Sequence, residues 1–177
     1  MADSQLESDL LGLEAGVVRL RDYSPRWAEM YALEAARICG ALGCLALDVQ
    51  HVGSTAIPGI KAKPILDIAV AVSSLADLPR FEAALTPLSY EYAHWAGVKN
   101  DLVFGKGKAR THLLHIVERD GEVWRDYLAF KSALLVNSEL ARQYEALKVA
   151  LSQSNADNRA AYTDAKGEFI RNVLSAA

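Results

Sequence analysis

Residues 64–72, with the sequence Pro-Ile-Leu-Asp-Ile-Ala-Val-Ala-Val, constrain the fold more than any other segment. Every residue after Pro64 in this run is apolar except Asp67. A strand with apolar residues on both faces is typical of the centre of a sheet that is covered on both sides. A buried carboxylate without a partner is costly, so Asp67 predicts a cation, a proton or a metal beside it.

Other predicted elements surround this strand. Pro25 suits the first position of a helix that apolar periodicity extends to about residue 42, where Gly43 ends it. Further strands are predicted over residues 45–52, 90–93, 101–105 and 110–118, and a helix from residue 74 or 77 to about 88. After Asp120-Gly121 the sequence predicts three helices, over residues 124–136, 139–151 and 156–174.

This order of elements predicts a single α+β domain over residues 17–177, with a mixed sheet flanked by helices and a helical C-terminal tail. The length of 177 residues suits one ordinary domain. Residues 1–16 are acidic and contain leucines, and we expect them to form a flexible or short helical arm.

Charge and hydropathy narrow the range of partners. A net charge of −3 gives no reason to expect nucleic acid, and no apolar run is long enough to span a membrane. The first residues are polar and acidic rather than basic and then apolar, so we expect a cytoplasmic protein.

Cys39 and Cys44 match neither a redox pair nor a zinc motif, and we expect two buried, reduced thiols.

The loop between the strands at 45–52 and 64–72 has the chemistry of a phosphate site. Gly53 would let the backbone approach a bulky anion, and Ser54 and Thr55 offer hydroxyls and backbone N–H groups. Lys63 would neutralise phosphate charge, and Asp67 would hold a divalent metal, for which we expect Mg²⁺, bridging those phosphates. Glycine, serine and proline also make ordinary loops, so the loop alone leaves both interpretations open.

Several blocks in order resemble the GrpB family. They are His51-Val-Gly-Ser-Thr-Ala-Ile-Pro-Gly, Lys63-Pro-Ile-Leu-Asp-Ile, residues 110–118, residues 124–128 and residues 161–170. The resemblance covers about residues 17–177 and implies a nucleotidyltransferase-like fold. Fusion of such domains to dephospho-coenzyme A kinase in some bacteria implies a link to coenzyme A metabolism, by analogy.

The departures from an active nucleotidyltransferase concern the acids. Such enzymes place Asp-x-Asp on this strand and a third acid on a later one, and together these acids bind two metals. Here Ile65 and Ala69 stand two residues away from Asp67, so its neighbour on the same strand face is missing. In an arrangement similar to the (p)ppGpp synthetases, Glu118 is the candidate for the second acid.

The histidines of the segment 110–118 fall on opposite faces of a regular strand, because side chains alternate. Relatives often have a polar residue at the position of Leu113, and this resemblance favours His115 as the histidine that faces the cleft. A structural role for either histidine stays open, as does a single-metal site of His112, His115 and Asp67.

Six further residues complete the candidate site. Arg110 is expected to contact phosphate, while His51 begins the Gly-Ser loop and either caps the strand or lines the cleft. Tyr127, with its neighbour Arg125, lies on a helix that could line the cleft. Tyr162 and Lys166 are four residues apart on one helical face and could reach back to the site.

Two functions from different classes follow. The first is metal-dependent nucleotidyl or phosphoryl transfer, with Asp67 as the metal ligand and His115 as a proton shuttle or substrate contact. The second is a degenerate domain that binds a nucleotide or another phosphorylated small molecule without turnover, which the missing second acid favours. A weaker alternative is an interaction domain whose cleft has lost its role.

Overall fold

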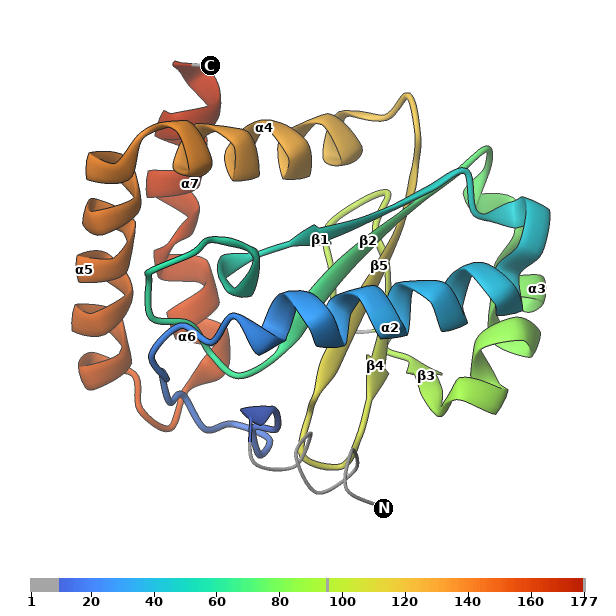
Figure 1. The fold of residues 1–177 in the computed structure, drawn as a ribbon, viewed down its shortest axis with the longest axis horizontal. Coiled ribbons are helices and arrows are strands. Elements are labelled where there is room, and N and C mark those ends of the chain that lie inside the picture. The colour runs from blue at the N-terminus through green and yellow to red at the C-terminus, as the bar shows by residue number, and fades with distance from the viewer. Residues whose placement is uncertain (1–9, 95, 177) are drawn as a thin grey trace.

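The computed structural model describes residues 10–94 and 96–176, which form a five-stranded mixed sheet with helices on both faces (Figure 1). The strands are β1 (Asp48–Val52), β2 (Leu66–Val72), β3 (Tyr90–Tyr92), β4 (Leu102–Lys106) and β5 (His112–Glu118), in the order β1-β2-β5-β4-β3. β2 and β5 are parallel, and the other neighbouring pairs are antiparallel. The predicted α+β class is confirmed.

The helices form layers around this sheet (Figure 1). α2 (Arg26–Leu42) and α3 (Leu78–Leu85) pack on one face, and α4 (Glu122–Val136) crosses the other. α5 (Ser138–Ser154), α6 (Arg159–Ala165) and α7 (Gly167–Ser175) stand together at the end where the β1–β2 loop lies. Short 3₁₀ turns are η1 (Gly43–Leu45), η2 (Ser54–Ala56), η3 (Leu75–Asp77) and η4 (Thr86–Leu88).

β2 is the buried centre of the sheet, as its apolar composition predicts. Apart from Asp67, each of its residues is at most 1% exposed. Leu66, Ile68 and Val70 belong to the core beneath α2 and α3, whereas Ala69 and Ala71 pack with Trp124 of α4. Because side chains alternate along a strand, Asp67 lies on the α4 face.

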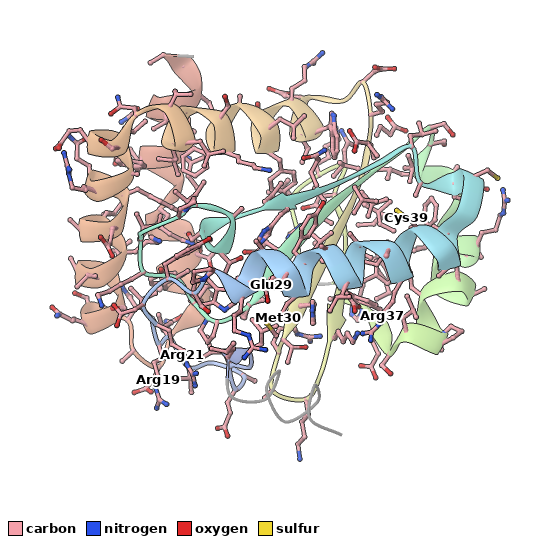
Figure 2. All side chains as sticks on the ribbon, viewed as in Figure 1. Arg19, Arg21, Glu29, Met30, Arg37 and Cys39 are labelled. Atoms are coloured by element: carbon pink, nitrogen blue, oxygen red, sulfur yellow. The ribbon has the colours of Figure 1, made fainter. Side chains whose placement is uncertain are left out.

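α2 shows how helical periodicity divides residues between core and solvent. Trp27, Ile38 and Leu42 are buried, and Gly43 ends the helix with a φ of +54°. Arg37 and Cys39 are exposed on the same helix (Figure 2). Cys39 and Cys44 are both exposed and free, so the expectation that they are buried is wrong. Cys39 follows the inward-facing Ile38, and one residue turns a helix by about 100°.

The single helix predicted over 156–174 is wrong, because the chain forms two helices that meet at Lys166 and Gly167. Glycine has the lowest helix propensity of the ordinary residues, which explains a break at this point. The Asn158 side chain caps α6 by accepting from the Ala161 N–H at 3.0 Å.

Residues 10–16 lie against the sheet domain, and residues 1–9 of the expected arm lie outside the described residues. Leu11 and Leu13 are buried, and Leu13 forms an antiparallel bridge with Arg110. The Gly12 N–H donates to the Pro64 carbonyl at 2.9 Å, beside the start of β2. No helix among the described residues combines the length and the apolar character that crossing a bilayer requires.

Candidate functional site

Gly53 and Asp67 approach each other closely at the edge of the site. Asp67 lies at the start of β2, opposite Val52 of β1, and Gly53 follows directly with a φ of +67°. A Cβ on Gly53 would lie 2.3 Å from Oδ2 of Asp67. Glycine therefore serves both the left-handed turn and the close approach. The Asp67 side chain is 29% exposed, so the carboxylate remains accessible.

His115 lies beside Asp67 on the α4 face of the sheet. It pairs with Ala69, two residues beyond Asp67 on the same strand face, and the small alanine leaves room for the imidazole. Nε2 of His115 is 3.9 Å from Oδ1 of Asp67, which is ion-pair range. Burial opposes ionisation of Asp67, but His115, Lys63 and Lys166 outweigh it and lower the pKa of the carboxyl.

A second carboxylate, Asp101, holds the other side of His115. Nδ1 of His115 lies 2.9 Å from Oδ2 of Asp101, and the Tyr127 hydroxyl donates to the same oxygen at 2.9 Å. The Asp101 side chain is 2% exposed, and its Oδ1 is buried without a hydrogen-bond partner among the described residues. Asp101 is thus buried against His115 and Tyr127, and it presents no accessible oxygen beside the exposed part of Asp67.

The two carboxylates make His115 a cation. Burial lowers the pKa of His115, but Asp101 and then Asp67 outweigh it and raise the pKa to about 10. Burial and Asp101 raise the pKa of Tyr127 well above its usual value, so its hydroxyl keeps its proton. The arrangement is a protonated imidazole between two carboxylates.

Lysines form the other side of the site. The Lys63 and Lys166 ammonium groups lie 5.1 Å and 4.6 Å from the centre of the Tyr162 ring. Lys148 of α5 is 1% exposed, lies 4.8 Å from the Tyr144 ring centre and donates to the Lys61 carbonyl. Burial, followed by neighbouring positive charge, lowers the pKa of both Lys148 and Lys166 to about 7.

The hydroxyls of Ser54 and Thr55 have different environments. Thr55 is 2% exposed, and its hydroxyl lies 2.9 Å from Nε2 of His51 and donates to the Ile65 carbonyl at 3.3 Å. The Thr55 hydroxyl predicted to contact phosphate instead supports the loop from within. Ser54 is half-buried and lies beside Tyr144. Burial raises the pKa of Tyr144 to about 12, although a hydrogen bond with Ser54 acts in the opposite direction.

Arg110 reaches the same sheet face from the β4–β5 turn. Asp67, Leu113 and Gly105 pair in one row across β2, β5 and β4 and share a face. A Cβ on Gly105 would lie 1.8 Å from the Arg110 guanidinium, so that group occupies the space a side chain would fill. With strands about 4.8 Å apart, it lies roughly 10 Å from Asp67.

Three predicted cleft residues lie elsewhere. His51 pairs with Ile68 and stacks on Tyr31 of α2, with 4.7 Å between ring centres, so it faces the opposite side of the sheet. His112 pairs with Leu66 and is 3% exposed on that same side. Burial lowers the pKa of each to about 4, so both are neutral.

Glu118, the third, pairs with Val72 at the far end of β2 and accepts from the Leu75 N–H at 3.4 Å. It is five residues along the strand from the row of Asp67, or about 17 Å. The expectations that Glu118 supplies a second acid and that both histidines join Asp67 at one metal are therefore wrong. Side-chain alternation places His112 and His115 on opposite faces of the sheet, and the length of the strand separates Glu118 from Asp67.

Asp101 and Lys148 are the residues that sequence reasoning missed. Asp101 follows a turn at Asn100 and stands in no motif; its only signal is an acid directly before an apolar strand that pairs with the strand of His115. Lys148 lies within a helix whose exposed face carries many charges, and nothing local marks it as buried.

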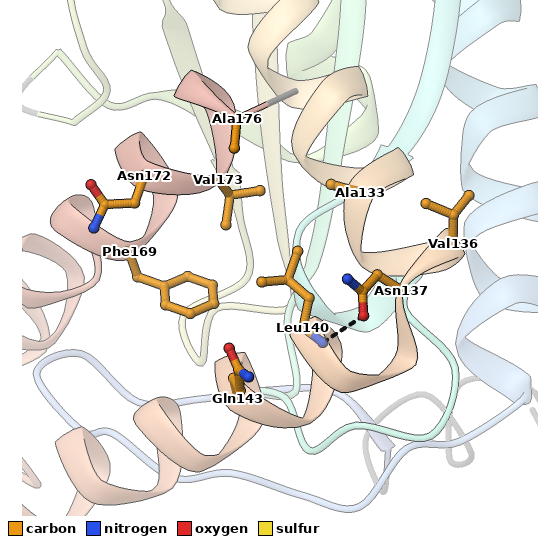
Figure 3. A pocket seen from close by; sticks show the side chains of 9 residues that line it. All are labelled: Ala133, Val136, Asn137, Leu140, Gln143, Phe169, Asn172, Val173 and Ala176. Carbon is orange, nitrogen blue, oxygen red and sulfur yellow. Dashed lines mark hydrogen bonds between the residues drawn. The ribbon is translucent and has the colours of Figure 1, made fainter.

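An open cavity of about 510 Å³ lies apart from Asp67, between α4, α5 and α7 (Figure 3). Its lining has no titratable side chain and consists of Ala133, Val136, Asn137, Leu140, Gln143, Phe169, Asn172, Val173 and Ala176. It therefore offers no group for acid–base chemistry. Among the described residues, no cluster of three or more His, Cys, Asp or Glu side chains could hold a metal ion.

Comparisons with known proteins agree on the family and the fold. The family model described as GrpB protein matches residues 17–176. The glutamate-rich protein GrpB of Alkalihalophilus pseudofirmus is 33% identical over 172 residues, covering 94% of this chain and 99% of that protein. The crystal structure of GrpB from Enterococcus faecalis has a TM-score of 0.81 and 31% identity, covering 89% and 96% of the two chains.

A more distant likeness concerns the fold alone. Terminal uridylyl transferase 4 from Trypanosoma brucei, solved with bound dUTP, has a TM-score of 0.52 and 14% identity. The match covers 86% of this chain and 53% of that enzyme. The nucleotidyltransferase-like fold expected from the sequence is thereby confirmed.

Proposed function

Because this chain belongs to the GrpB family and has a nucleotidyltransferase-like fold, we propose that it binds a nucleotide or another phosphorylated small molecule beside Asp67. The observation that carries the proposal is the pair of ammonium groups, Lys63 and Lys166, on one tyrosine ring next to a partly exposed carboxylate. Positive charge gathered in one part of a fold is suited to an anionic ligand.

The β1–β2 loop supports the same assignment. Gly53 is exposed and has a positive φ, which leaves the backbone open to a bulky group. Ser54 is half-buried and brings a hydroxyl to the same place. Arg110 would reach the outer part of a ligand that extends across Leu113.

The donor set does not fit the two Mg²⁺ ions of a transferase. Asp67 is the one partly exposed acid of the site, because Asp101 is buried against His115 and Tyr127. Its neighbour His115 is a cation, and Lys63 and the protonated form of Lys166 add positive charge that would repel a metal. This favours binding over metal-dependent transfer, and we derive no catalytic step through Mg²⁺.

A nucleotide screen followed by thermal unfolding tests the proposal. We expect at least one nucleoside phosphate to raise the Tm of the full chain, because a ligand that binds only the folded state stabilises it. Asp67→Asn should change the shift without unfolding the protein. Mass spectrometry after long incubation would detect turnover, and absence of any shift across the screen would refute the proposal.

A further inference from the structure

Three lysines from separate parts of the chain converge on one side of Asp67. Lys63 comes from the loop before β2, Lys148 from α5, and Lys166 from the junction of α6 and α7. Each ammonium lies within 5.1 Å of the ring centre of Tyr144 or Tyr162. We call Lys63, Lys148 and Lys166 the lysine cluster.

Two members of the cluster, Lys148 and Lys166, place positive charge in a largely buried environment. Among the described residues, no carboxylate lies within salt-bridge distance of Lys148 or Lys166. Asp67 is the nearest acid to influence Lys166, and Glu145 influences Lys148. Burying like charges together opposes folding, so the arrangement indicates a role other than stability.

Lys148 also holds the segment that carries Lys63. Its side chain is 1% exposed, and its ammonium donates to the carbonyl of Lys61, two residues before Lys63. Because Lys61 also donates its backbone N–H to Glu145 at 2.6 Å, α5 holds this segment at two points. Lys63 is thereby presented toward Tyr162 and Lys166.

We infer that Lys63 and Lys166 bind a chain of two or more phosphates directly, without a divalent cation. The inference rests on the proposed function and names its ligand class: a nucleoside diphosphate or triphosphate, or an inorganic polyphosphate. Fixed ammonium groups supply the neutralising charge that Mg²⁺ supplies in many phosphate sites. An extended anion is required to reach from Lys63 and Lys166, which lie over the same Tyr162 ring, toward Arg110, roughly 10 Å from Asp67 on the same sheet face.

Isothermal titration calorimetry of the full chain tests this inference with pyrophosphate, tripolyphosphate, orthophosphate and ATP, each in excess EDTA and in excess Mg²⁺. We expect pyrophosphate and ATP to bind in EDTA at least as tightly as with Mg²⁺, and more tightly than orthophosphate. Binding that requires Mg²⁺ would overturn the inference and leave the proposed function standing. Absence of binding by every probe in both conditions would overturn the proposed function itself.

Variants separate a ligand contact from a structural role. Lys166→Gln should weaken pyrophosphate binding about tenfold, as expected for one charge-assisted contact, while leaving the Tm equal or higher. Lys166→Arg, which keeps the charge, should stay within a few-fold of wild type. Lys108→Gln, in the exposed β4–β5 turn, is the matched control and should change nothing. A lower Tm with unchanged affinity for Lys166→Gln would assign Lys166 to structure and overturn the inference.

Discussion

Nδ1 of His115 lies 2.9 Å from Oδ2 of Asp101, and this buried pair sets the charge of the site. Asp101 immediately precedes β4, and His115 lies within β5, so the β4–β5 hairpin brings them together. The opposite nitrogen of the ring faces Asp67 at 3.9 Å. Position 115 thus presents a cation to Asp67 beside Ala69, where the sequence lacks the second acid of an Asp-x-Asp pair.

His115→Gln should remove the contribution that the positive charge of His115 makes to the free energy of unfolding, and this contribution depends on pH. The pKa of His115 in the folded protein is about 10, above the ordinary value of 6.5. Its stabilising contribution is therefore complete below about pH 6.5 and is lost as the pH rises through 10. Urea unfolding should show a gap between wild type and variant that is widest near pH 6 and shrinks toward pH 10.

Gly53→Ala should be more harmful than the same change at Gly59. Both glycines have positive φ, +67° and +82°, which costs a non-glycine residue about 1 kcal/mol or more. A methyl group on Gly53 would also collide with Asp67, whereas one on Gly59 meets nothing within 4 Å. We expect denaturant midpoints to show a further loss of ~1–3 kcal/mol for Gly53→Ala. Equal losses would contradict the close approach of Gly53 and Asp67.

Thr55→Val should mainly lower stability, whereas Ser54→Ala should mainly lower ligand affinity. Thr55→Val removes a buried hydroxyl that contacts His51 and Ile65, and should destabilise the protein by about 1–3 kcal/mol with ligand affinity unchanged. Ser54→Ala removes a half-buried hydroxyl that bonds to Tyr144, and should cost less stability than Thr55→Val while weakening phosphate binding. Unfolding and calorimetry on the same pair of variants distinguish the two roles, and reversed profiles would refute the assignment.

Tyr127→Phe should destabilise the buried cluster around Asp101. The Tyr127 hydroxyl donates to Oδ2 at 2.9 Å, and Oδ1 already has no hydrogen-bond partner among the described residues. Losing this donor should cost about 1–2 kcal/mol in the free energy of unfolding. Tyr92→Phe removes a half-buried hydroxyl outside the cluster and should have a smaller effect.

Anion binding should weaken as the pH rises. Lys148 and Lys166 have pKa values of about 7, so both lose their protons as the pH passes through that value. Lys63, Asp67 and Glu145 also face these groups, and the lowered pKa of Asp67 keeps its carboxylate ionised over this range. Sulfate suits the measurement because its charge is constant from about pH 6 to pH 9. The increase in Tm that sulfate causes should become smaller as the pH rises. Lys166→Arg should flatten the curve, since arginine stays protonated.

Much of the architecture could be predicted from short-range patterns. The apolar run of β2, the end of α2 at Gly43 and the approach of Lys166 to Tyr162, four residues earlier, follow from local composition and periodicity. Alternation also assigned His112 and His115 to opposite strand faces, although it could not say which face carries the site. The break between α6 and α7 was missed because a single glycine hardly changes the apolar periodicity of the segment. The exposure of Cys39 was missed because a shift of one residue along a helix decides whether a side chain is buried.

The sequence by itself determined that Asp67 begins a central strand after a Gly-Ser loop, because apolar alternation and glycine are local properties of the chain. Only the tertiary structure decided what surrounds that carboxylate. Asp101, Tyr127 and Lys148 reach the site through the β4–β5 hairpin and the packing of α4 and α5, contacts that span many residues. Burial among these groups sets the charge of His115 and the lysines, and burial depends on how all the elements pack together.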